Sequence, residues 1–321
     1  MREITEPVAL CLPDGRLNPG AVGWSRRPLH DTALKGWGRT KRWEYWCVMT
    51  EGALVALTVS DLDFIGVNGI YFAADGLPPV TSEAIAPFGL GTRLPASLGG
   101  RAASRLPRIE IVDGADEIAL RSQGKIEVDL TVRRPAGHET LNVVVPWSER
   151  RFQFTSKQTA LPATGTVRTG GREYVFGADS WAVLDHGRGR WPRDMVWNWG
   201  AASGRTGGHV VGLQFGGKWT AGTGMTENAL CVDGRITAIP RELTWSYDAA
   251  DEHAPWTITG PGVDVVFTPF HRRAVDVNAL LLRNRTVQQF GRYSGVIEPS
   301  PGERVTVDGL RGWAEEVTMR W

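Results

Sequence analysis

The clearest pattern of apolar and polar positions in the chain is the alternation over residues 125–132. Side chains two residues apart share one face of a strand, so Ile126, Val128, Leu130 and Val132 are predicted to face a core together. Shorter apolar or aromatic runs predict further strands at residues 43–49, 53–59, 64–72, 108–112, 117–121, 141–145, 209–215, 229–232, 243–247, 256–259, 263–267, 280–282, 304–307 and 316–321.

Glycine pairs separate several of these predicted strands. Asp113-Gly114 and Gln123-Gly124 lie between neighbouring strands, where such pairs favour tight hairpins. Residues 75–106 show little pattern, and no long amphipathic helix is predicted. Many short strands joined by glycine turns indicate an all-β fold made of antiparallel barrels or sandwiches.

An internal repeat predicts the domain organisation. Aromatic motifs at residues 43–46 and 197–199 are each followed by a strand that ends in Asp-Gly, at residues 68–76 and 228–234. Repetition at this long period is typical of two similar β-domains rather than a solenoid. The join is expected within residues 161–171, which are rich in turn formers. The predicted domains are residues 1–165, with an irregular lead-in over residues 1–40, and residues 166–321.

Charge and composition exclude several classes of function. The chain has 36 basic and 35 acidic residues, and so lacks the basic excess of a nucleic-acid-binding protein. No apolar run is long enough to span a bilayer, and the N-terminus does not resemble a signal peptide, so no stable membrane insertion is expected. Three widely spaced cysteines suit a reducing compartment, and we expect a cytoplasmic location. The oligomeric state is left open.

The candidate chemistry is concentrated at residues 177–202, where titratable side chains stand among four tryptophans. Asp185 and His186 are a candidate acid–base pair, because a carboxylate can orient a histidine that titrates near neutral pH. The alternative is that Asp185 pairs with Arg188 or Arg190 and fixes a loop. Trp197 and Trp199 share one face of a predicted strand, with Asn198 on the other, and would either stack on a ligand or pack in a core.

Further candidates lie outside this stretch. Glu227, beside Asn228, becomes a proton donor if burial raises its pKa, and otherwise forms a structural ion pair or a hydrogen bond that closes a hairpin. Lys157 would place a cation in the same region. The cations of residues 271–273 are predicted to be a solvated strand end. The six histidines show no metal-ligand spacing, and no nucleotide or serine-hydrolase motif is present, so neither a metal nor another cofactor is expected.

The order of these motifs resembles a bacterial family known only as domain of unknown function 2804. More distantly, it is similar to the two-domain lipocalin-like proteins that include carotenoid hydratases, tocopherol cyclases and fungal Diels–Alderases. The resemblance implies paired calycin-type barrels, no metal or redox cofactor, and an apolar substrate between or inside the barrels. It rests on residues 42–46, 156–162, 184–192, 197–199, 226–230, 288–295 and 315–321.

The sequence therefore predicts two lipocalin-like antiparallel β-barrels in tandem. A pocket at or between them would bind a small apolar or aromatic molecule and act on it by acid–base chemistry, as a lyase, hydratase or isomerase-cyclase. The alternative is a carrier of lipids or other hydrophobic ligands that performs no chemistry. The predicted catalytic residues are Asp185, His186 and Glu227. The predicted substrate-binding residues are Trp46, Lys157, Arg188, Trp197, Asn198, Trp199 and Asn228.

Overall fold

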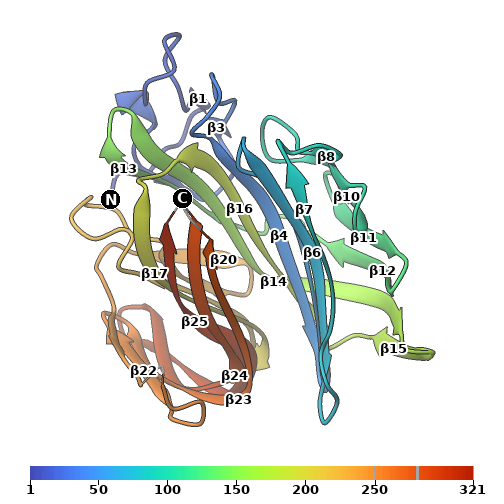
Figure 1. The fold of residues 1–321 in the computed structure, drawn as a ribbon. Helices are drawn as coiled ribbons and strands as arrows, with labels where there is room; N and C mark the ends of the chain where they lie inside the picture. The colour runs from blue at the N-terminus through green and yellow to red at the C-terminus, as the bar shows by residue number, and fades with distance from the viewer. Residues whose placement is uncertain (249, 280–281, 321) are drawn as a thin grey trace.

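The fold consists of two antiparallel β-sheets that face each other (Figure 1), as a computed structural model of the chain shows. The structure describes residues 1–248, 250–279 and 282–320; the predicted strand at residues 280–282 therefore lies largely outside the described residues. Apart from the short 3-10 helix η1 (Pro19–Ala21), every regular element among the described residues is a strand. The predicted all-β class with two lipocalin-like antiparallel units is confirmed, although the second unit is a half-barrel rather than a closed barrel.

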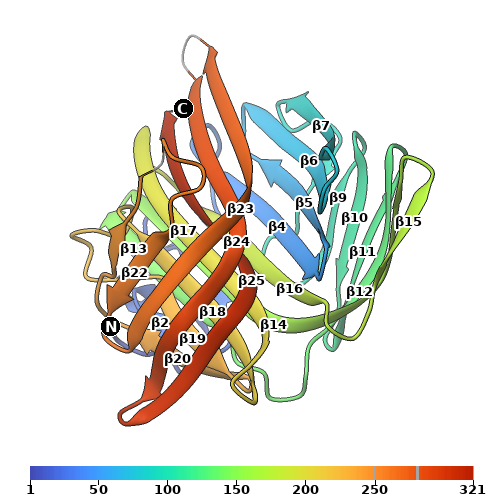
Figure 2. The same ribbon diagram turned by 90° about the horizontal axis from the view of Figure 1, so that it is seen from below.

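The first sheet has 14 strands and is curled into an almost closed barrel (Figure 2). Its main path runs in the order β7-β6-β5-β4-β16-β14-β12-β11-β10-β9-β8, while β2, β13 and β15 pair beside this path. Its strands are β2 (Trp24–Ser25), β4 (Lys41–Thr50), β5 (Ala53–Asp61), β6 (Ile65–Ala74), β7 (Val80–Pro87), β8 (Thr92–Arg93), β9 (Gly100–Ser104), β10 (Arg108–Asp113), β11 (Glu117–Gln123), β12 (Ile126–Arg133), β13 (Leu141–Ser148), β14 (Arg151–Thr169), β15 (Arg172–Phe176) and β16 (Trp181–Arg190).

The second sheet has nine strands and forms an open half-barrel in the order β20-β19-β18-β17-β25-β24-β23-β22-β21. Its strands are β17 (Asp194–Thr206), β18 (His209–Gly217), β19 (Asn228–Val232), β20 (Arg235–Ile239), β21 (Thr244–Ser246), β22 (Trp256–Gly260), β23 (Val263–Ala279), β24 (Leu282–Ser300) and β25 (Glu303–Arg320). A separate small pair, β1 (Val8–Ala9) with β3 (His30–Asp31), belongs to the N-terminal lead-in.

The alternation over residues 126–132 is confirmed, because Ile126, Val128, Leu130 and Val132 are all buried in the first barrel. One expectation is wrong, because residues 75–106, where little pattern was found, contain β7, β8 and β9. Residues 161–169, which are rich in turn formers, belong to the last part of β14.

Strand β14 tolerates turn-forming residues because it changes partners along its length. Its first part pairs with β13 and β16, and its last part pairs with β12 and β15. At the change, Gly165 has a φ of 137°, and a Cβ there would lie 2.1 Å from the carbonyl oxygen of Asp129. Only glycine allows this close approach.

The chain passes from the first sheet to the second between Arg190 and Asp194. Strand β16 lies inside the first sheet, between β14 and β4, and β17 pairs with β18 and β25 of the second. The strand pairing thus changes sheets after residue 190. The predicted domain division at residues 165 and 166 stays a prediction.

Each sheet buries one apolar face inside its own curl and presents the other face to the partner sheet. Trp46 belongs to the core inside the first barrel, and Trp256 to the core inside the half-barrel. Between the sheets, Cys47 and Val183 of the first pack with Trp313 of the second. Because side chains alternate along a strand, neighbouring residues of β4 and β16 lie in different layers. This alternation decides which residues can reach a cavity between the sheets.

Candidate functional site

A cavity of about 330 Å³ lies between the two sheets. Its lining includes side chains from β4, β5, β14 and β16 of the first sheet and from β17, β23, β24 and β25 of the second. Six aromatic residues form much of its wall. They are Trp43, Tyr45, Trp191, Trp197, Trp199 and Trp219. A concave space with an aromatic wall and a few polar groups is typical of small-molecule sites.

Trp191 organises one side of this wall. It stands in the crossover between the sheets, where its ring stacks on Trp219 with centroids 5.6 Å apart and the planes 7° from parallel. Trp43 and Trp197 meet it edge-on at 5.8 and 5.6 Å. Its indole Nε1 donates to Gln153 Oε1 at 2.6 Å. Rings held by such mutual packing form a rigid surface before any ligand binds.

A buried ammonium group joins two carboxylates in the cavity. Lys157 Nζ lies 3.1 Å from both Asp185 Oδ1 and Glu227 Oε2. The Lys157 side chain is 6% exposed and that of Glu227 is 2% exposed. The ammonium also lies 4.1 Å from the ring centroid of Trp199, within cation–π distance. The sequence-predicted residues Lys157, Asp185, Glu227, Trp197 and Trp199 are therefore brought together.

Burial and the mutual charges of these side chains decide the protonation of Lys157 and Glu227. Burial raises the pKa of Glu227; Lys157 lowers it again in part, and the nearby charge of Asp185 adds to the rise. Burial would lower the pKa of Lys157, but the two carboxylates outweigh it and raise that pKa. Lys157 is therefore a cation at neutral pH, and Glu227 is more easily protonated than an exposed glutamate.

Indole groups hydrogen-bond the buried carboxyl groups from the cavity wall. Trp43 Nε1 donates to Asp185 Oδ2 at 3.1 Å, and Trp219 Nε1 donates to Glu227 Oε1 at 2.6 Å. Thr155 Oγ1 adds a donor to Asp185 Oδ1 at 3.1 Å. The tryptophans of the wall and the carboxyl groups are thus linked by hydrogen bonds, so a displaced tryptophan would also displace its carboxyl group.

Glu315 is a third buried carboxyl group that the sequence analysis did not select. It accepts hydrogen bonds from Trp197 Nε1 at 3.0 Å and from Gln288 Nε2 at 2.9 Å. Burial raises its pKa to about 7. The sequence alternation along β25 could have identified Glu315, because it places this residue on the same face as Trp313 and Val317. A charged residue on an apolar face is a candidate for function.

Arg273 is a second lining residue that the sequence analysis misplaced. The cations of residues 271–273 are not a solvated strand end, because β23 continues to Ala279. Arg273 lies over the ring of Tyr71 at 4.5 Å and pairs with Glu83 at 2.9 Å, both in the first sheet. The change from apolar residues to cations suggested that the strand ends there, yet β23 stays paired with β24 through residues 271–273.

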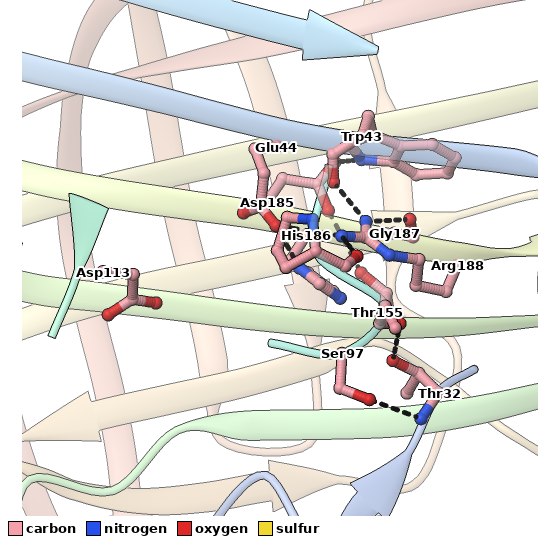
Figure 3. A network of polar contacts seen from close by, with 12 residues as sticks. Thr32, Trp43, Glu44, Ser97, Asp113, Thr155, Asp185, His186, Gly187 and Arg188 are labelled. Carbon is pink, nitrogen blue, oxygen red and sulfur yellow. Dashed lines mark hydrogen bonds and ion pairs between the residues drawn. The ribbon is translucent and has the colours of Figure 1, made fainter. Parts of the chain in front are cut away.

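His186 and Arg188 are not among the residues that line the cavity, and both contact Glu44 instead (Figure 3). His186 Nδ1 lies 2.7 Å from Glu44 Oε1, and Arg188 Nη2 donates to the same oxygen at 3.1 Å. Burial and the Arg188 charge lower the pKa of His186. Adjacent residues of a strand point to opposite faces, so Asp185 and His186 do not meet in one cavity. The partner of Arg188 is Glu44 rather than Asp185.

The remaining predicted residues serve other contacts. Trp46 lies in the core of the first barrel. Asn198 Nδ2 donates to Tyr247 Oη at 2.8 Å, on the half-barrel side of β17. Asn228 Oδ1 accepts from the backbone N–H of Gly216 at 2.7 Å. None of these three side chains is among the described residues that line the cavity.

Gly187 provides the space for the Trp43 ring. A Cβ on Gly187 would lie 2.1 Å from Cζ2 of Trp43, so Gly187→Ala must displace the indole that donates to Asp185. We expect a loss of about 1–3 kcal/mol in the free energy of unfolding, measured by urea denaturation. Gly177→Ala is the control, because a Cβ there meets nothing within 4 Å. Equal losses in the two variants would contradict this explanation.

Within the described residues, no three histidine, cysteine, aspartate or glutamate side chains come together in a way that could hold a metal ion. The described part of the chain contains no helix with the length and apolar character needed to span a bilayer.

The chain belongs to a protein family described as Domain of unknown function (DUF2804), whose family model matches residues 1–321. A crystal structure of CghA with Sch210972 is similar to it with a TM-score of 0.55 and 13% sequence identity, covering 91% of this chain and 89% of that chain. A protein assigned as AttH from Nitrosomonas europaea has a TM-score of 0.51 and 12% identity, covering 88% and 92%. A search of curated protein sequences found no match. At these identities the structural similarity is one of fold.

Proposed function

We propose that this member of the DUF2804 family binds a small apolar or aromatic molecule in the cavity between its sheets. We further propose that its own carboxyl groups act on that molecule by acid–base chemistry of the lyase, hydratase or isomerase-cyclase type. The observation that carries the proposal is a set of three carboxyl groups, the buried Glu227 and Glu315 and the partly buried Asp185, beside the buried Lys157 ammonium and inside an aromatic wall. The fold neighbour CghA, solved with Sch210972, is in keeping with ligand binding by such a fold.

Glu315 is the proposed proton donor, because a carboxyl group with a pKa of about 7 is often protonated at neutral pH. Its O–H bond breaks while the π electrons of a substrate double bond form a new C–H bond. The resulting cation is stabilised by the π faces of Trp197 and Trp199. Glu227, whose pKa burial also raises, is the second carboxyl that can donate.

Asp185 is the proposed base. It removes a proton from the neighbouring carbon, whose C–H electrons form the new double bond of an isomerised product. In a hydration, water adds to the cation and Asp185 takes the released proton instead. Lys157 holds Asp185 and Glu227 in place, and Glu315 is reprotonated from solvent.

The test begins with native mass spectrometry of the protein from its host, which identifies a co-purified small molecule. The turnover of that molecule by the purified protein is then measured. With that molecule, Asp185→Asn, Glu227→Gln and Glu315→Gln are expected to lower turnover about 10²–10⁴-fold, the usual contribution of a general acid or base. Glu316→Gln is the matched control, because Glu316 points to the other face of β25 and pairs with Lys218.

Two results would overturn the catalytic proposal. Turnover that survives Asp185→Asn and Glu315→Gln together would show that these groups are not the base and the acid. Binding without any turnover, weakened by tryptophan variants and unaffected by the carboxyl variants, would identify a carrier instead. One observation favours the carrier. The carboxyl groups of Asp185 and Glu227 already accept hydrogen bonds from tryptophans and pair with Lys157, and such contacts can stabilise a binding cavity without any chemistry.

A further inference from the structure

An exposed tryptophan stands at the tip of the loop that leads into β4. The loop sequence is Lys35-Gly-Trp-Gly-Arg39, and Trp37 is 62% exposed. Its ring meets Phe64 with centroids 4.5 Å apart, and Phe64 is itself 55% exposed. Phe88 and Leu90 extend this apolar surface, since the backbone N–H of Phe88 donates to the carbonyl of Phe64.

The loop is held in shape by a buried carboxylate. Asp63 is almost fully buried and accepts hydrogen bonds from the backbone N–H groups of Gly38 and Thr40 at 2.6 and 2.8 Å. Arg42 pairs with the same carboxylate at 3.1 Å. Trp37 is therefore presented to solvent by a fixed loop, although burying it would be favourable.

Four cations gather beside this apolar surface: Lys35, Arg39, Arg151 and Arg190. Burial together with the charges of Arg39 and Arg190 lowers the pKa of Arg151, and Arg190 Nη2 lies 3.3 Å from where a Cβ of Gly36 would stand. None of the four forms an ion pair within the part of the chain that the structure describes. The nearby carboxylates Asp14 and Glu149 are both held by Arg16.

This surface borders the cavity between the sheets. Leu62 lines the cavity two residues before Phe64, and Trp191 lines it directly after Arg190. Lys35–Arg39 also leads within four residues to Trp43, another lining residue. A ligand that entered at this end of the sheets would pass the exposed aromatic side chains.

We propose that Trp37, Phe64, Phe88 and Leu90, with the four cations, form a docking surface for an anionic lipid bilayer. Tryptophan favours the interface between headgroups and acyl chains, and unpaired lysine and arginine attract anionic headgroups. The whole chain has a formal net charge of only +1, so any attraction to anionic headgroups would come from these four cations. Docking here would bring the cavity next to a source of apolar molecules, and it does not require the cavity to be catalytic.

The test is sedimentation of the full-length protein with vesicles of phosphatidylcholine, alone or mixed with phosphatidylglycerol. We expect binding to the mixed vesicles, weakened by salt, and little binding to phosphatidylcholine alone. Arg39→Glu and Trp37→Ala should each weaken partitioning about fivefold or more. Val175→Ala and Arg172→Glu are the matched controls, since Val175 is 66% exposed and both residues lie in β15, which belongs to the first sheet but not to this surface.

Unchanged melting temperatures would show that the variants fold, and unchanged ligand binding in the cavity would separate this surface from the proposed function. The proposal is overturned if wild-type protein fails to bind mixed vesicles, or if the two controls reduce binding as much as Arg39→Glu and Trp37→Ala. It is equally overturned if the surface binds duplex DNA or RNA in an Arg39-dependent way while ignoring vesicles.

Discussion

Replacing Lys157 with methionine is expected to lower the free energy of unfolding near neutral pH by about 3–5 kcal/mol, the loss typical of breaking a buried ion pair. Methionine fills a similar volume but leaves Asp185 and Glu227 buried without their cation. The cation–π contact with Trp199 is lost as well. Urea denaturation followed by tryptophan fluorescence measures the change.

The pH dependence identifies the cause of that loss. Lys157 lowers the pKa of Glu227, so without the ammonium Glu227 favours its protonated form more strongly, and the deficit should shrink as the pH falls toward 5. Lys218→Met is the matched control, because the Lys218–Glu316 pair is partly exposed and should contribute only about 0–1 kcal/mol. A pH-independent deficit in Lys157→Met would instead point to poor packing of the methionine.

Local patterns were enough to predict the fold class. The alternation in β12 and the glycine pairs at the β10–β11 and β11–β12 hairpins depend on neighbouring residues only, and both predictions match the structure. Long strands were harder, since β14 and β24 each carry 19 residues and include glycine and proline. Gly165 suggests a turn when only the sequence is known, yet it lies within β14 and has a positive φ there. A single-residue rule cannot separate these two uses of glycine.

The candidate site was predicted in part because its residues are unusual for their surroundings. Asp185 and Glu227 stand among aromatic residues in the sequence, and the structure places both in the cavity. Their joint contact with Lys157 could not be predicted, since it depends on how the two sheets face each other. His186 was predicted to pair with Asp185, but β16 runs through both residues, and adjacent residues of a strand point to opposite faces.

Glu315 should make the free energy of unfolding fall as the pH rises. Its pKa rises from 4.5 to about 7 on folding because of burial, so the folded protein holds a proton that the unfolded chain releases. The free energy of unfolding should therefore fall as the pH rises from about 4.5 to about 7, by about 3 kcal/mol from this group. Glu315→Gln should remove that decline, as seen in urea unfolding over this pH range.

Glu316→Gln is the control with the opposite sign. Burial would raise the pKa of Glu316, but its contacts with Lys218 and Tyr247 outweigh burial and lower it, so Glu316 contributes stability that is lost as the pH falls. The two neighbouring variants should therefore change opposite ends of the pH profile. If Glu315 is also the proton donor, turnover of the wild type declines above about pH 7, where the proton is lost. A stability profile in which Glu315→Gln follows the wild type would mean that Glu315 is ionised when folded, and it could then not supply that proton.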